Sequence, residues 1–260
     1  MTKFKVLFLS LFLISSLQAS YENDDDSLGN IALQVGIWNL TTNGLITNES
    51  ANGNTDYKKD LGYKEDKVVN TFSVDLKNDT SWLPNVNLSY FRLNNSATNT
   101  INGTRTIDVV NDMNGSLSSN LLYQEVNMIF YGFLYQGPIE FDFGLNIKKI
   151  DFSQKIRENS GFKRNLEIKG PDSILVLPYM ALKFNIDFIN TVLMAQTSIL
   201  SFGDNEAKDY MYSINYRVMK NIYLSYGYKY NSFKTTNSKN TNEIYDINIK
   251  GNYISCKVLF

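Results

Sequence analysis

The chain has 260 residues, with 25 Lys and Arg against 26 Asp and Glu, so its formal net charge is −1. This balance, without any basic block, excludes nucleic-acid binding, because phosphate contacts require clustered lysines and arginines. Histidine is absent, which argues against enzymes that use imidazole as a base near neutral pH.

The N-terminus predicts a secretory signal peptide. Lys3 and Lys5 precede an apolar run at 6–17, and Ala19 is a small residue at the expected cleavage point. An uncleaved anchor helix is the alternative, but the run is shorter than the ~20 apolar residues that span hydrocarbon. We therefore expect residues 1–19 to be removed and residues 20–260 to form one domain.

Later in the chain no run reaches the ~18 apolar residues of a membrane helix. Cys256 is the single cysteine, so it has no partner for an internal disulfide. No spacing of Cys, Asp or Glu is typical of a metal site. We predict no cofactor.

Residues 20–260 instead alternate between apolar and polar residues, which is the pattern of β-strands with two different faces. Clusters of turn-forming residues separate the runs. We expect about ten strands, with eight or twelve as the alternatives, near 29–41, 66–77, 85–95, 119–135, 138–152, 173–186, 189–202, 208–219, 221–234 and 246–260.

The run at 138–152 distinguishes a soluble β-sandwich from a membrane β-barrel. Apolar residues such as Phe141 and Phe143 alternate with polar residues that include Glu140, Asp142 and Lys148. A soluble β-sandwich buries one face of each strand, whereas the polar face of a membrane barrel lines its lumen and the apolar face meets lipid. The pattern therefore predicts an all-β, transmembrane, antiparallel up-and-down β-barrel.

The connections between the predicted strands alternate in length. Short ones lie at 78–84, 136–137, 187–188 and 220–221, and the last of these predicts a two-residue hairpin turn. Longer polar ones lie at 42–65, 96–118, 153–172, 203–207 and 234–245. Bacterial barrels have short periplasmic turns and longer external loops, so an even strand count predicts both termini in the periplasm.

The last strand ends on an aromatic residue. Ile254, Cys256, Val258 and Phe260 form one apolar face. This face resembles the signal that the outer-membrane barrel-insertion machinery reads. The resemblance implies that this machinery, periplasmic chaperones and outer-membrane lipid are the partners of the chain.

Three segments carry a closer resemblance: VGIWNLTTNG at 35–44, WLPNVNLSYF at 82–91 and LPYMALKF at 177–184. Together with the order of strands, they resemble a family of small Gram-negative outer-membrane β-barrel proteins of unassigned function. The resemblance runs through essentially the whole chain after the signal peptide. It implies a barrel in the outer membrane, and it provides no catalytic residues.

Acids and bases both occupy inward positions of the predicted barrel. They are Asp75, Glu125, Glu140, Asp142, Lys148, Lys183, Arg217, Lys229 and Lys257. One interpretation is a mutually neutralising network that fills a narrow lumen, because buried charges must be paired. The other is a small polar pore. A wide channel is excluded, since ten strands enclose only slightly more space than eight, which side chains can fill.

Two surface features have structural explanations. Tyr90, Phe130, Tyr210 and Phe233 fall near strand ends, where we expect an interfacial aromatic girdle. Asn114 lies in an acidic-extended Asn-x-Ser sequence that resembles bacterial N-glycosylation sites, a pattern that chance often produces in an Asn-rich chain.

Three functional hypotheses remain open. The first is a non-enzymatic structural or surface-exposed protein that acts through its external loops. The second is a narrow, porin-like channel for ions or small polar solutes, and the third is a histidine-independent enzyme. The sequence does not indicate the oligomeric state.

Overall fold

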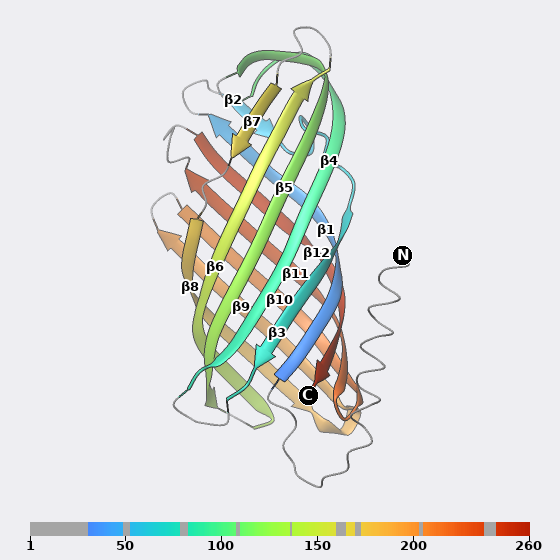
Figure 1. Cartoon of the computed structure of the whole chain (residues 1–260), viewed down its shortest axis with the longest axis vertical. Coiled ribbons are helices and arrows are strands. Elements are labelled where there is room, and N and C mark those ends of the chain that lie inside the picture. The colour runs from blue at the N-terminus through green and yellow to red at the C-terminus, as the bar shows by residue number, and fades with distance from the viewer. Residues whose placement is uncertain are drawn as a thin grey trace.

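A computed structural model of the chain describes residues 31–48, 53–78, 83–107, 110–135, 137–159, 165–169, 173–202, 205–236 and 243–260. Figure 1 shows an elongated barrel of tilted strands. The expected signal peptide lies outside the described residues. Within them, no helix is long and apolar enough to cross a membrane.

Ten strands form a closed ring. Each pairs antiparallel with its neighbour in the chain, and the last pairs with the first. The short strands β2 and β7 pair with β1 and β6. The predicted up-and-down barrel of about ten strands is therefore confirmed. The strands are β1 (Ile31–Asn48), β2 (Gly53–Asp56), β3 (Lys67–Leu76), β4 (Asn85–Ile107), β5 (Val110–Tyr135), β6 (Ile139–Glu158), β7 (Asn165–Lys169), β8 (Ser173–Ile186), β9 (Thr191–Phe202), β10 (Asn205–Met219), β11 (Ile222–Thr236) and β12 (Glu243–Leu259).

One end of the barrel carries the short turns. Lys220 and Asn221 form the predicted two-residue turn between β10 and β11. Between β8 and β9, a 3-10 turn at Asp187–Ile189 ends on Asn190, whose φ of 51° is left-handed. The described chain ends meet at the same end of the barrel, where the Phe260 N–H donates to the Ile31 carbonyl at 2.8 Å. We call this the short-turn end and its opposite the long-loop end.

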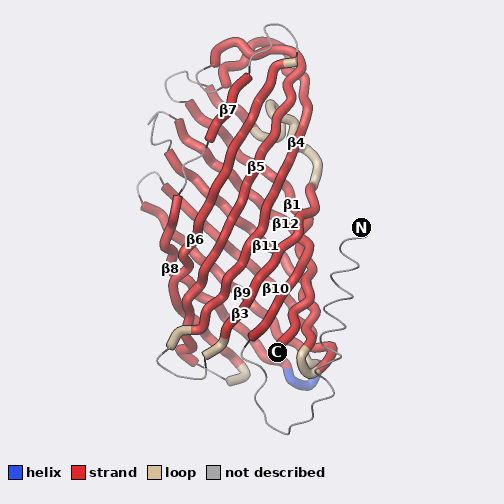
Figure 2. The backbone as a smooth tube through the Cα atoms, viewed as in Figure 1, coloured by secondary structure: helices blue, strands red, loops and turns tan. Residues whose placement is uncertain are grey.

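The structure corrects the lengths of four strands. β1 continues to Asn48, beyond the predicted end at 41. β4 continues to Ile107, β5 begins at Val110, and β6 continues to Glu158 (Figure 2). The predicted loop 96–118 is therefore mostly a β-hairpin. The predicted loops 42–65 and 153–172 contain β2 and β7.

These strands are longer than predicted because their polar and apolar faces exchange midway. In β6, Leu145 faces outward with an exposed fraction of 52%, and Lys148 faces inward. Immediately beyond, Lys149 faces outward, while Ile150 and Phe152 are buried inside. Side chains still alternate inward and outward through this exchange, but the outward side chains change from apolar to polar and the inward ones from polar to apolar.

The same exchange occurs around the barrel at one level. In β5, Val126 and Met128 are exposed below Glu125, whereas Leu121 and Tyr123 are buried beyond it. The outer surface is therefore apolar toward the short-turn end and polar toward the long-loop end. The interior shows the opposite arrangement.

Two seams divide the long-loop half of the barrel. β3 and β4 pair only along 71–76 and 86–91, and β8 and β9 pair only along 179–186 and 191–198. Beyond these points the wall separates into two layers, with β4, β5, β6 and β8 crossing in front of β9 to β12 and β1 in Figure 1. This half therefore packs as two sheets over a shared core, as in a β-sandwich.

That core contains large apolar side chains from almost every strand. It comprises Trp38, Leu40, Ile46, Tyr57, Leu61, Tyr63, Val69, Phe91, Leu93, Ile101, Leu117, Leu121, Tyr123, Ile150, Phe152, Ile156, Ile168, Leu177, Ala207, Phe233, Tyr245, Ile247, Ile249 and Tyr253. The expectation of a polar lumen along the whole barrel is therefore wrong for the long-loop half. We call this set the apolar plug.

Candidate functional site

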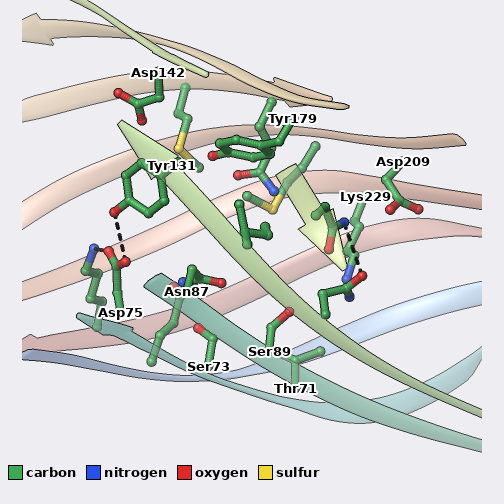
Figure 3. Close-up of a pocket in the computed structure, with 18 of the residues that line it drawn as sticks. Thr71, Ser73, Asp75, Asn87, Ser89, Tyr131, Asp142, Tyr179, Asp209 and Lys229 are labelled. Atoms are coloured by element: carbon green, nitrogen blue, oxygen red, sulfur yellow. Dashed lines mark hydrogen bonds and ion pairs between the residues drawn. The ribbon is translucent and has the colours of Figure 1, made fainter. Parts of the chain in front are cut away.

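The short-turn half of the barrel encloses a cavity of ≈ 350 Å³. It extends from Lys77 and Asn185, beside the short turns, to Trp38 and Phe91 at the edge of the apolar plug. Inward strand positions are polar in this half, so hydroxyl, amide and charged groups line the space. Figure 3 shows hydroxyl and amide side chains on one wall, where it labels Thr71, Ser73, Asn87 and Ser89.

Two sets of paired charges lie in this cavity. Lys257 Nζ lies 3.4 Å from Asp75 Oδ2, and the Tyr131 hydroxyl donates to Asp75 Oδ1 at 2.8 Å. Lys183 Nζ lies 2.8 Å from Asp142 Oδ2 and 3.3 Å from Glu140 Oε2. Asp75 and Lys257 therefore balance each other, whereas Lys183 faces two carboxylates, so the second set has one excess negative charge.

A second cluster, in which Lys148 and Glu125 are fully buried and Asp209 is 18% exposed, lies at the level where the strand faces exchange. Lys148 has a completely buried side chain, and its Nζ lies 3.1 Å from Glu125 Oε2 and 2.6 Å from Asp209 Oδ1. Glu125 also accepts hydrogen bonds from Tyr123, at 2.9 Å, and from the amides of Asn127 and Asn231. Such complete satisfaction is what a buried charge requires. We call Glu125, Lys148 and Asp209 the buried triad.

Lys229 lies beside the triad but does not join it. Its Nζ is 5.0 Å from the ring centroids of both Trp38 and Phe91, and these rings meet edge to face. In the described part of the chain no carboxylate oxygen lies within 4.0 Å of this ammonium. Aromatic faces attract a cation through their quadrupole, so these rings stabilise the charge without neutralising it.

The segment that follows β2 closes the long-loop end. Tyr57, Leu61 and Tyr63 are buried in the apolar plug. Ser119 Oγ donates to the Leu61 carbonyl at 2.6 Å, and Gln154 Nε2 donates to the Tyr63 hydroxyl at 2.8 Å. These bonds hold residues 57–63 inside the mouth of the barrel.

The burial of these tyrosines makes this closure sensitive to alkali. Burial raises the pKa of Tyr63 to about 12, and it also raises the pKa of Tyr57. The phenol of an unfolded chain ionises at about 10. The stability that a neutral Tyr63 provides is therefore complete below pH ~10 and is lost as the pH rises toward ~12.

We expect residues 57–63 to become sensitive to protease between those pH values, when limited proteolysis is followed against tyrosinate absorbance. The Tyr63→Phe variant should lose one late-titrating phenol and resist cleavage at higher pH. Cleavage that begins well below the ionisation of Tyr63 would contradict this coupling.

The structure places most of the predicted lumen charges around the cavity. Asp75, Glu125, Glu140, Asp142, Lys183, Lys229 and Lys257 line it. Lys148 lies deeper, in the buried triad. Arg217 is instead exposed at the short-turn end, where its guanidinium donates to Asn190 Oδ1 at 2.7 Å.

Sequence reasoning missed several residues of the site. Asp209 completes the buried triad, and the alternation in β10 could have identified it, because it shares the inward phase of Ser213. Trp38 and Phe91, which flank Lys229, could not be identified in this way. The alternation of their strands points both side chains inward, but the sequence predicts a polar lumen, in which large apolar side chains are not expected.

The proposed interfacial aromatics divide into two groups. Tyr90 is exposed on the outer surface, and Phe130 and Tyr210 are half-buried. Phe233 is only 2% exposed and belongs to the apolar plug. The prediction of a girdle position for Phe233 is therefore wrong, because the faces of β11 exchange before this residue.

The C-terminal residues lie on β12 and directly after it. Ile254 is exposed on the outer face and Cys256 is half-buried, whereas Val258 is buried. Phe260 follows the strand and is half-buried. Among the described residues, no group of three Cys, Asp or Glu side chains is arranged to hold a metal ion.

Comparisons with known proteins identify the fold. No protein-family model matches the chain, and no curated protein sequence matches it. The solved structure of the outer membrane protease OmpT from Escherichia coli aligns with 92% of this chain and 99% of its own, at a TM-score of 0.52 and 11% identity.

The translocator domain of the autotransporter NalP from Neisseria meningitidis covers 98% of this chain and 95% of its own, at a TM-score of 0.44 and 12% identity. At such identities the likeness is one of fold alone. The chain has the fold of a small Gram-negative outer-membrane β-barrel, which confirms the expected resemblance at that level.

Proposed function

We propose that this chain is an integral outer-membrane protein without enzymatic activity, whose barrel does not conduct and whose long-loop half has a surface-exposed role. The observation that carries the proposal is the apolar plug. Large side chains fill the interior of the long-loop half, and the buried triad lies directly beneath them. A porin-like channel, the alternative, needs a continuous polar path through this level.

The exchange of strand faces supports a membrane position for the short-turn half. A barrel in lipid has an outward apolar band, and a protein body in water has a polar surface over an apolar core. Both arrangements occur here in one set of strands. We therefore assign the short-turn end, with both termini, to the periplasm and the long-loop half to the cell exterior.

Planar-bilayer recording of the purified protein tests the proposal. We expect no reproducible single-channel steps from folded protein, whose folding is verified by heat-modifiable migration on a detergent gel. Regular steps that disappear in a Lys183→Ala variant would overturn the proposal and establish the channel.

A matched pair of arginine substitutions on β6 tests the membrane position. Leu145→Arg places a charge in the proposed lipid band and should cost up to about 2–4 kcal/mol of unfolding free energy if the residue lies near the bilayer midplane. Asp151→Arg introduces the same side chain on the same face beyond the band, so a change within about 0.5 kcal/mol is expected.

Urea titration of both variants in lipid vesicles provides the measurement. Equal losses of unfolding free energy in the two variants would mean that Leu145 and Asp151 both face lipid or both face water. That result would contradict the proposal that the lipid-facing band of β6 ends between Ile147 and Lys149.

A further inference from the structure

We propose that the cavity at the short-turn end binds a small zwitterion, a molecule that carries an ammonium group at one end and a carboxylate at the other. Two observations carry this proposal: an unsatisfied oxygen of the buried carboxylate of Asp142, and the ammonium of Lys229, which has no direct ion-pair partner among the described residues. Both line the same cavity. Figure 3 shows them on opposite sides of it, with Tyr179 between them.

Asp142 forms the acidic end. Its side chain is 1% exposed, and Lys183 approaches only one of its two oxygens, Oδ2. Its Oδ1 has no hydrogen-bond partner among the described residues, and neither has the Oδ1 of Asn146, four residues further along β6. Buried polar atoms normally have partners, so two unsatisfied acceptors on one strand indicate a place for a donor from outside the chain.

Aromatic side chains favour a cationic donor at this end. The rings of Tyr131 and Tyr179 lie 6.0 Å apart and flank Gly144, to which both residues are register partners. Lys183 Nζ lies 6.0 Å from the centroid of the Tyr131 ring, so this wall, which adjoins Asp142, already attracts a cation.

Lys229 forms the basic end. The two carboxylates nearest to it are held by Lys148, which contacts both Glu125 and Asp209, and neither lies within ion-pair distance of Lys229. The Lys229 ammonium contacts only the rings of Trp38 and Phe91 and remains partly exposed to the cavity. A ligand carboxylate at this position would provide the direct ion-pair contact that the described residues do not.

The overall balance of charge excludes ligands with a net charge. The cavity wall is balanced in charge, because its acids and lysines are equal in number once Lys148, which contacts two of the acids, is included: Asp75, Glu125, Glu140, Asp142 and Asp209 against Lys77, Lys148, Lys183, Lys229 and Lys257. A molecule with only one charge therefore leaves one end unsatisfied and adds a net charge to a weakly hydrated interior. The cavity volume lies at the lower end of the range for small-molecule sites, which suits a short chain.

A series of straight-chain amino acids measures the distance between the two ends. Glycine, β-alanine, γ-aminobutyrate and ε-aminocaproate are titrated into the folded full-length protein in lipid nanodiscs by calorimetry. Butylamine and butyrate serve as single-charge controls matched to γ-aminobutyrate. We expect one chain length to bind best, and to bind at least about tenfold more tightly than the amine or the acid of the same length, as one lost charge-assisted hydrogen bond implies.

Two variants assign the ends. Asp142→Asn should weaken the best zwitterion by about tenfold and leave butyrate unchanged, whereas Lys229→Gln should weaken it similarly and leave butylamine unchanged. Asp151→Arg, on the outer surface, is the control and should bind as the unmodified protein does. Heat-modifiable migration verifies that each variant is folded.

The titrations on the unmodified protein keep the proposal falsifiable if a variant does not fold. Absence of saturable binding across the series would overturn the zwitterion site, as would equal binding of zwitterions and single-charge controls. The non-conducting barrel is tested separately by bilayer recording, so failure of either proposal is distinguishable from failure of the other.

Discussion

Replacing Lys148 with methionine is expected to destabilise the barrel by about 3–5 kcal/mol, because it leaves two buried carboxylates without their shared cation. Lys148 is completely buried and lies within ion-pair distance of both Glu125 and Asp209. Methionine fills a similar volume, so the loss of unfolding free energy comes from the missing charge more than from packing. Urea titration in lipid vesicles measures this loss, and refolding from urea tests whether unfolding is reversible.

A compensated variant provides the control. Lys148→Met combined with Asp209→Asn removes one positive and one negative charge, so Glu125 and the neighbouring Lys229 still balance each other, and each new side chain keeps a similar shape. Replacing a buried ion pair with neutral groups is often nearly neutral. We therefore expect the double variant to recover most of the lost stability. A double variant no more stable than Lys148→Met would show that the hydrogen bonds of Lys148, rather than its charge, stabilise this level of the barrel.

The position of the buried triad explains which parts of the fold the sequence predicted. Below it, Leu145 and Ile147 alternate with Asp142 and Lys148 in the pattern of a membrane strand. There the predicted strands, the two-residue turn between β10 and β11 and the up-and-down order are confirmed. Beyond it, the same strands become polar outside and apolar inside. A two-residue period with a phase change resembles the end of a strand, so the sequence predicts loops where β1, β4, β5 and β6 continue.

The same phase change limited the prediction of the site. The acids and bases of the short-turn half follow the strand phase, and the sequence placed Asp75, Asp142 and Lys183 inside. Which charges meet across the barrel depends on strand register and tilt. No local pattern reveals that Lys148 contacts Asp209, 61 residues away, while Lys229 is left between two rings.

Trp38→Ala is expected to cost about 3–5 kcal/mol of unfolding free energy, the usual penalty for removing a buried tryptophan. Trp38 is completely buried, meets Phe91 edge to face at 5.0 Å, and donates its indole N–H to the Gly251 carbonyl at 3.1 Å. Trp38→Phe keeps an aromatic face for Lys229 and loses mainly the hydrogen bond and part of the volume. It should cost less than half as much.

Trp38→Ala also tests how many layers of side chains close the barrel. Beyond Trp38 the interior continues through Leu40, Tyr123 and Tyr63, all fully buried or nearly so, toward the long-loop end. Removing one ring therefore enlarges the cavity without opening a path, and Trp38→Ala should remain silent in planar bilayers despite its lost stability. Steady conductance from this variant, with none from Trp38→Phe, would mean that a single aromatic layer separates the two sides. In that case the barrel would be a gated channel, since the charged cavity would end on a removable barrier rather than on a packed core.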